Sequence, residues 1–138
     1  MEKTFVIEGN YYGDKTFPSL NNLLAEFGKN PRAGGRMKKT YQDIACIHAR
    51  RDLKGYKAQC PIKILYVLVE PSRGHKRDIS NVLSFAMKVI EDALQTIGVI
   101  KNDDPAHVTG FEYRFEYGTQ PRIEVTIIEQ GGTDECLK

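Results

Sequence analysis

The chain has 138 residues, of which 41% are hydrophobic and 28% are charged, and its formal net charge is +2. This length and apolar content predict one soluble domain with a single core. This net charge is too small to identify a nucleic-acid-binding protein from overall charge alone. No apolar run approaches the roughly 20 residues that span a bilayer. The first ten residues, MEKTFVIEGN, have too short an apolar run for a signal peptide, so we expect a cytoplasmic protein without membrane contact.

Four segments in the first half of the chain have the patterns of regular elements. Residues 4–8 predict a short strand, and residues 19–27 predict a short helix that a serine caps and a glycine ends. Residues 38–54 predict a second helix with a basic last turn. Residues 62–70, IKILYVLVE, are the most apolar stretch of the chain, which favours a central strand.

Residues 28–40, GKNPRAGGRMKKT, carry five basic residues and no acidic residue. A proline and two glycines predict that the first half of this segment is irregular. Two interpretations stay open. The segment is a solvated flexible loop, or it is an arm in which Lys38 and Lys39 bind DNA phosphates.

A second basic segment follows the apolar strand and leads to the most informative part of the sequence. Its residues Arg73, Lys76 and Arg77 are candidate DNA contacts, and they directly precede Asp78. From residue 79 to residue 97, apolar residues recur at the spacing of one buried helical face. A second stripe of the same helix consists of Asn81, Phe85, Lys88 and Asp92.

Beyond Gly98, the expected end of this helix, an acidic turn contains Asp103 and Asp104. The helix is about 28 Å long at 1.5 Å rise per residue. If Asp104 is to meet Asp78, the chain must run back along the helix, or a second subunit must supply one of the sites. The sequence leaves both routes open.

Two further segments, residues 111–117 and 122–129, alternate between apolar and polar residues and are joined by a short turn. We expect a β-hairpin with one buried face. The aromatic stripe of its first strand belongs to the core or, as the alternative, stacks bases, and a period of two favours the core. The whole pattern predicts a single small α+β domain over residues 1–130, with about four strands in a mixed sheet packed against two main helices. We expect residues 131–138 to be a disordered tail.

Carboxylates beside a lysine, reached through a cationic loop, suit metal-assisted hydrolysis of phosphodiesters. Mg²⁺ prefers oxygen ligands, and an ammonium group stabilises charge on the phosphate. Each residue also has a simpler interpretation: Asp78 as a helix cap, Asp103 and Asp104 as turn residues, and Lys88 as the partner of Asp92 one helical turn away.

The ordered combination resembles the RusA-type Holliday-junction resolvases, especially the longer phage and prophage members. The resemblance lies in Asp78-Ile-Ser-Asn81, in Lys88-Val-Ile-Glu-Asp-Ala-Leu94, and in Gly98-Val-Ile followed by the acidic pair at 103 and 104. Less densely, it covers most of residues 4–129. It implies a Mg²⁺-dependent homodimer, with Mn²⁺ as a possible substitute ion, that resolves four-way DNA junctions by paired nicks in recombination and repair.

By the resemblance, Asp78 and Asp104 bind the metal with Asp103 beside them, and Asp78, Lys88 and Asp104 are catalytic. The chain departs from the family pattern at Ser80, where the pattern has an aspartate, and in about one extra helical turn before Lys88. Three hypotheses follow: a nuclease acting on branched DNA, a non-catalytic junction-binding protein of the same fold, and a metal-dependent hydrolase of small nucleotides.

Overall fold

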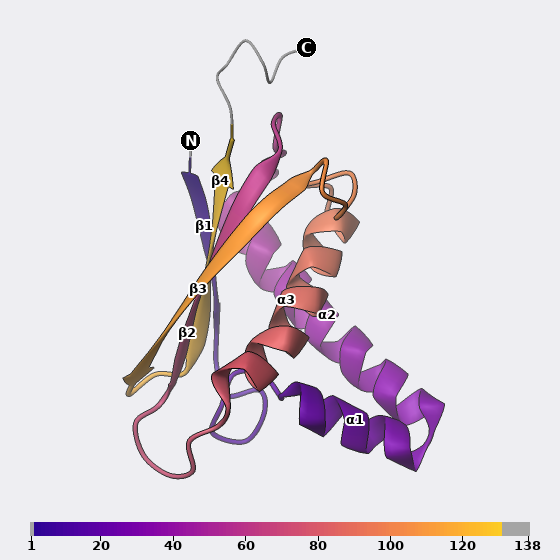
Figure 1. The fold of residues 1–138 in the computed structure, drawn as a ribbon, viewed down its shortest axis with the longest axis vertical. Coiled ribbons are helices and arrows are strands. Elements are labelled where there is room, and N and C mark those ends of the chain that lie inside the picture. The colour runs from indigo at the N-terminus through magenta and orange to yellow at the C-terminus, as the bar shows by residue number, and fades with distance from the viewer. Residues whose placement is uncertain (1, 131–138) are drawn as a thin grey trace.

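The computed structural model describes residues 2–130, which form a single small α+β domain. A four-stranded mixed sheet lies on one side, α2 and α3 lie against one of its faces, and α1 packs on these two helices (Figure 1). This confirms the expected fold class, whereas the expected tail, residues 131–138, lies outside the described residues. In chain order the elements are β1 (Glu2–Glu8), α1 (Leu20–Lys29), α2 (Pro31–Leu53), β2 (Ile62–Pro71), α3 (Ile79–Thr96), β3 (Val108–Gly118) and β4 (Arg122–Glu129).

The strands are ordered β1-β4-β2-β3 across the sheet. β4 runs antiparallel to both β1 and β2, whereas β3 runs parallel to β2. The expected hairpin of β3 and β4 is therefore wrong, because β2 lies between them. The apolar composition of β2 explains this: its helix-facing side chains from Ile62 to Leu68 are fully buried and Val69 is 1% exposed, so β2 is most stable with a strand on each side.

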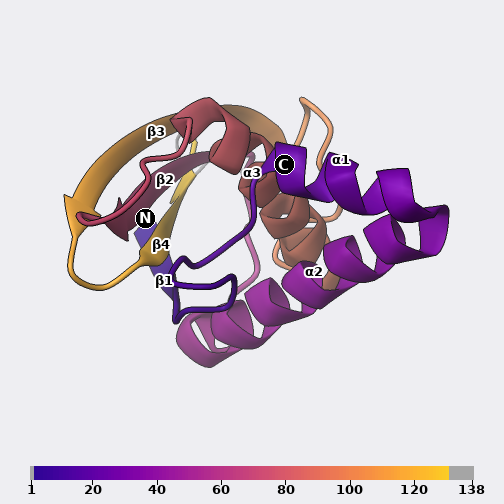
Figure 2. The same ribbon diagram turned by 90° about the horizontal axis from the view of Figure 1, so that it is seen from below.

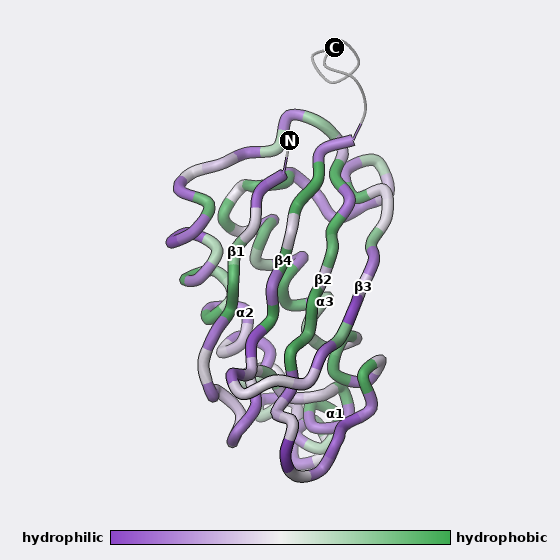
Figure 3. The backbone as a smooth tube through the Cα atoms, turned by 90° about the vertical axis from the view of Figure 1, so that its left-hand side faces the viewer, coloured by the Kyte–Doolittle hydropathy of each residue, from purple (hydrophilic) through white to green (hydrophobic). Residues whose placement is uncertain are grey.

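One face of the sheet forms the core with the helices. Its inward side chains come from three strands and pack against α2 and α3; they include Phe5, Ile7, Ile64, Tyr66, Leu68, Ile123, Val125 and Ile127. The opposite face has no helix over it, and polar residues alternate with apolar ones along its strands (Figure 3). On this open face Thr4 and Thr126 share a hydrogen bond of 3.0 Å, and Lys63 pairs with Glu112.

Helices α1 and α2 form an antiparallel hairpin that extends away from the sheet (Figure 2). The expected irregular segment after residue 28 is instead helical, since α2 begins at Pro31. Asn30 caps it by accepting a hydrogen bond from the Ala33 N–H at 2.8 Å, and Pro31 occupies the first helical position, where no N–H is needed. The glycine at position 34 lets the Phe27 ring of α1 lie against α2.

Helix α3 confirms the expected amphipathic helix between Asp78 and Gly98. Its buried side chains include Val82, Leu83, Ala86, Ile90, Ala93 and Leu94, as the periodicity predicts. Phe85 is a correction: it is 2% exposed and does not belong to the solvent-facing stripe with Lys88. Its ring makes edge contacts with Phe17 and Tyr41, with centroids at 6.1 and 5.7 Å, which ties α3 to α2.

Candidate functional site

The N-terminus of α3 presents the first candidate carboxylate. Asp78 is exposed, caps the helix and accepts hydrogen bonds through Oδ1 from the Ser80 N–H at 3.1 Å and the Ser80 hydroxyl at 2.8 Å. These bonds, chiefly the one from the hydroxyl, lower the pKa of Asp78, so it is ionised at neutral pH. Ser80 is thus a donor that occupies an oxygen of Asp78.

The basic loop before Asp78 divides into exposed and buried cations. Arg73 and Lys76 are exposed, and the Lys76 ammonium lies 4.6 Å from the centroid of the Tyr117 ring. Arg77, by contrast, is 11% exposed and donates two hydrogen bonds, of 2.9 and 3.0 Å, to the carboxylate of Glu70, which is 3% exposed. Arg77 therefore anchors the loop and holds Asp78 in place, and its charge is already paired.

The middle of α3 carries a cluster of charged groups around Lys88. The Lys88 ammonium lies 3.2 Å from Asp92 and 3.7 Å from Asp103, and these neighbours raise its pKa, Asp92 most strongly. Glu91 adjoins the cluster; burial first, and then the charge of Asp103, raise the pKa of this glutamate. The chain after Gly98 thus runs back along the helix far enough to bring Asp103 to Lys88.

Asp104 lies in the turn that precedes β3 and bonds within that turn. Its Oδ1 accepts hydrogen bonds from the N–H groups of Ala106 at 3.1 Å and His107 at 3.2 Å. The His107 ring lies 2.7 Å from the same oxygen and lowers the pKa of Asp104. Asp104 is therefore an ionised carboxylate held at the start of β3.

A single protomer does not bring all the predicted site residues together. Lys88 follows Asp78 by ten residues, which is about 15 Å along the helix axis. Asp103 meets Lys88, whereas Asp78 bonds to Ser80 at the start of α3 and Asp104 bonds within the turn that precedes β3. Residues 2–130 contain no group of three or more His, Cys, Asp or Glu side chains arranged to bind a metal.

The other predicted DNA contacts lie on the helical hairpin. Lys38 is partly exposed on α2, and Lys39 is exposed and pairs with Asp43 at 2.7 Å. Arg32 and Arg36 are exposed on the same end of α2. The hairpin therefore projects a basic end away from the sheet, although Lys39 already has an acidic neighbour.

The aromatic stripe of β3 corrects the sequence prediction most clearly. The stripe shares the helix-facing side of the sheet, because Phe111, Tyr113 and Phe115 pair in register with the core residues of β2. Its members are nevertheless 40–56% exposed, since no helix covers this edge. A groove of about 440 Å³ separates the stripe from α3; its lining residues include Ser80, Leu83, Ser84, Met87, Lys88 and Glu91.

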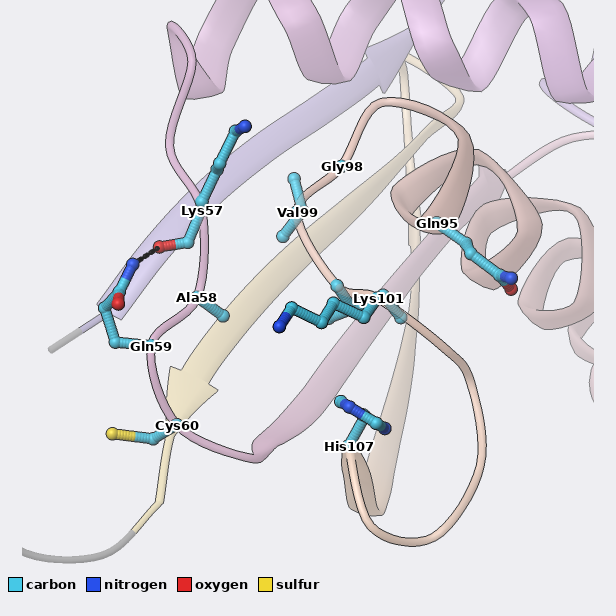
Figure 4. Close-up of a pocket in the computed structure, with 10 residues that line it drawn as sticks. Lys57, Ala58, Gln59, Cys60, Gln95, Gly98, Val99, Lys101 and His107 are labelled. Atoms are coloured by element: carbon cyan, nitrogen blue, oxygen red, sulfur yellow. Dashed lines mark hydrogen bonds between the residues drawn. The ribbon is translucent and has the colours of Figure 1, made fainter. Parts of the chain in front are cut away.

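A second cavity, of about 570 Å³, opens near the start of β3. In Figure 4, Lys101 extends across it toward the 57–60 segment, and His107 lies on its wall. Because His107 also contacts Asp104, this cavity adjoins the acidic turn.

Sequence reasoning did not single out Glu91. Glu91 lies between Lys88 and Leu94, and its neighbour Ile90 belongs to the buried face of the helix. The helical periodicity therefore already indicated that the carboxylate of Glu91 would be partly buried. No protein-family model matches the chain, and no curated protein matches it either.

Proposed function

We propose that this protein is a Mg²⁺-dependent endodeoxyribonuclease that acts on branched DNA. The observation that carries the proposal is the Lys88 ammonium between Asp92 and Asp103, on a helix whose N-terminus presents Asp78 behind a basic loop. The resemblance of this segment to the RusA-type resolvases supports the four-way junction as substrate.

The electrostatics of this face suit a polyanion that reaches ionised carboxylates. Arg73 and Lys76 stand exposed at the approach to Asp78, and the basic end of α2 adds a second contact region. Cations placed this way attract the DNA backbone and offset its repulsion by the acidic residues. An ammonium between two carboxylates is positioned to contact a phosphate when DNA displaces one of these neighbours.

We further propose that the protein works as a homodimer whose two copies together complete each site. The separation of Asp78 and Asp104 within one protomer supports the second of the two routes that the helix length leaves open, in which another subunit supplies a carboxylate. Two symmetric sites also match paired incision of a four-way junction.

The test is cleavage of a synthetic four-way junction with Mg²⁺ or Mn²⁺. We expect paired nicks from the wild-type protein and at least a hundredfold loss of rate in Asp104→Asn and Lys88→Ala, a loss typical of a removed charge-stabilising group. Glu124→Gln is the matched control, because Glu124 lies on the opposite face of the sheet and, among residues 2–130, forms an ion pair with Arg122 alone. Equal rates for Asp104→Asn and Glu124→Gln would refute the assignment.

A second candidate is a junction-binding protein that does not cut. Ser80 favours it, because this hydroxyl stands where the family has an aspartate and donates to Asp78. Tight junction binding without nicks in either metal would favour this candidate. In that case Ser80→Asp is the informative variant, since recovered cleavage would identify the serine as the cause.

A further inference from the structure

The groove between α3 and β3, of about 440 Å³, has apolar side chains on both of its walls. On β3 these are the rings of Phe111 and Tyr113, which are 55% and 56% exposed. On α3 they are Leu83 and Met87. Exposed apolar surface gathered in a groove is typical of a ligand-binding site, and aromatic rings on one wall suit a flat ligand whose faces are apolar.

Two polar groups beside these walls lack a partner. Tyr66 is fully buried in register beside Tyr113, and its hydroxyl has no hydrogen-bond partner among residues 2–130. Glu91 lines the groove, is partly buried, and forms no hydrogen bond or ion pair within the same range. The two groups are close enough that the charge of Glu91, after burial, raises the pKa of Tyr66. Because such groups cost free energy until they are paired, this part of the groove suits a ligand that forms hydrogen bonds.

Cations border the same surface. Lys88 lines the groove, and at the far end of the aromatic stripe the Lys76 ammonium lies 4.6 Å from the centroid of the Tyr117 ring. Proteins that bind single-stranded nucleic acids combine cations, which contact phosphates, with aromatic rings on which bases stack. The surface therefore fits a ligand that is flat, forms hydrogen bonds at its edge and is attached to anionic groups. A nucleobase on its phosphate backbone has these three properties.

We propose that the groove between α3 and β3 binds one unpaired nucleobase of DNA, which stacks on Tyr113 and turns its polar edge toward Glu91. The choice of DNA as the source of the base rests on the proposed function. A base inside a duplex enters such a groove only if it is flipped out of the stack, whereas a base that is already unpaired enters without that cost. The groove thus distinguishes unpaired bases from a continuous duplex.

Glu91 also determines which bases fit. A carboxylate accepts a hydrogen bond from the exocyclic amino group of adenine or cytosine, whereas thymine has a carbonyl oxygen in the corresponding position. Thymine would leave Glu91 unpaired and would bring two acceptors together. We therefore expect adenine to bind about tenfold more tightly than thymine, which is the discrimination that one good base contact gives.

Fluorescence anisotropy with labelled single-stranded oligonucleotides tests the groove in EDTA, where no cleavage is required. The two probes are oligo-dT and the same oligo-dT with one central adenine, and the wild-type protein should prefer the second about tenfold. Tyr113→Ala should weaken binding of the adenine probe by about tenfold, as is typical when a stacked ring is removed. Its control is Ile47→Ala, which removes a 63% exposed apolar side chain on α2, outside the groove, and should leave the affinity unchanged.

A second variant tests the base preference separately. Glu91→Leu removes the hydrogen-bond acceptor, keeps a side chain of similar size, and should bind the two probes equally. Glu116→Leu is the matched control, because it removes the same charge from the opposite face of β3 and should keep the preference for adenine. Circular dichroism of each variant verifies folding.

Three binding results would overturn the inference: no binding of single strands by the wild-type protein, equal affinities of Tyr113→Ala and Ile47→Ala, or an adenine preference that Glu91→Leu keeps. A change in sedimentation of Tyr113→Ala without a change in oligonucleotide affinity would overturn it too, because a protein surface would then cover the groove. The junction assay separates these results from the proposed function. Oligonucleotide binding through Tyr113 without nicks in Mg²⁺ supports the groove and refutes the nuclease. Nicking by Tyr113→Ala at the wild-type rate, with unchanged oligonucleotide affinity, supports the nuclease and refutes the groove.

Discussion

The contact between α1 and α2 offers a prediction in which two adjacent glycines give opposite results. A Cβ atom at position 34 would lie 2.2 Å from Cδ1 of Phe27, whereas a Cβ at position 35 would meet no atom within 4 Å. Both glycines lie inside α2. Gly34→Ala therefore tests the close packing of the hairpin, and Gly35→Ala is its matched control.

The magnitude follows from the geometry. Ordinary contact begins near 3.4 Å, so the Phe27 ring or the α1 backbone must move by about 1.2 Å in Gly34→Ala. Overpacking of this kind costs about 1–3 kcal/mol, and replacing a helical glycine by alanine returns about 0.5–1 kcal/mol. The expected net loss in free energy of unfolding is about 1–2 kcal/mol for Gly34→Ala, against a gain of about 0.5–1 kcal/mol for Gly35→Ala.

Urea denaturation followed by circular dichroism measures both changes, and thermal midpoints should move in the same directions by about 4 °C per kcal/mol. The double variant Phe27→Ala/Gly34→Ala removes the ring that the new methyl group meets. In the Phe27→Ala background, Gly34→Ala should therefore become stabilising. If Gly34→Ala is as stable as Gly35→Ala with Phe27 in place, the packing argument is wrong.

Three further predictions concern charged residues. Arg77→Ala should destabilise the protein by about 3 kcal/mol in urea denaturation, because it leaves a buried carboxylate unpaired; the exposed Arg73→Ala should change stability by less than about 0.5 kcal/mol, and equal effects would contradict the burial argument. The neighbouring guanidinium lowers the pKa of Asp52, so the stabilisation is complete above the ordinary carboxyl pKa and disappears as pH falls through the lowered folded value. Asp52→Asn should thus lose about 1 kcal/mol at neutral pH and converge with wild type only once the pH has fallen below the lowered folded pKa of Asp52, and a loss independent of pH would count against this linkage. The Lys38→Ala/Lys39→Ala variant should bind junction DNA with a shallower salt dependence, because the number of ions released falls by about one for each phosphate contact removed. An unchanged slope would show that these two lysines at the basic end of α2 are solvated and do not contact DNA.

The elements that the sequence predicted best are those whose pattern and burial agree. Helix α3 has its apolar residues at helical spacing, a capping aspartate at one end and a glycine beyond the other. β2 has an apolar run of strand length that ends at Pro71. In both elements, local propensity and the tertiary environment favour the same structure, so the local sequence pattern is enough to predict it.

The start of α2 was predicted wrongly because glycine and proline have position-dependent meanings. Pro31 is a breaker inside a helix, but at the first helical position its missing N–H costs nothing, and Asn30 supplies the cap. Gly34 lowers helix propensity, but it creates the space in which Phe27 packs. The sequence contains the cap signal, whereas the ring contact depends on how two helices cross.

The candidate site was predictable as a set of residues and not as an assembly. Periodicity places Lys88 on α3, with Asp78 at its N-terminal end, and the structure shows Lys88 within the helix and Asp78 as its cap. The distance along the helix already required a returning chain or a second subunit. The structure shows that the return brings Asp103 to Lys88, while Asp104 bonds to His107 within its own turn. These side-chain choices depend on local hydrogen bonds that residue spacing does not encode.

Alternation in β3 was read correctly as a strand and wrongly as a hairpin with a buried face. A period of two specifies that the two faces of a strand differ, but it does not specify what covers the apolar one. In an interior strand the cover is a helix of the same chain, as it is for Tyr66 on β2. In an edge strand that no helix covers the same pattern stays exposed, as for Tyr113, which lies in register beside Tyr66. Two neighbouring tyrosines, 0% and 56% exposed, therefore show that the place of a strand in the sheet, and not its alternation, decides whether its apolar face is buried.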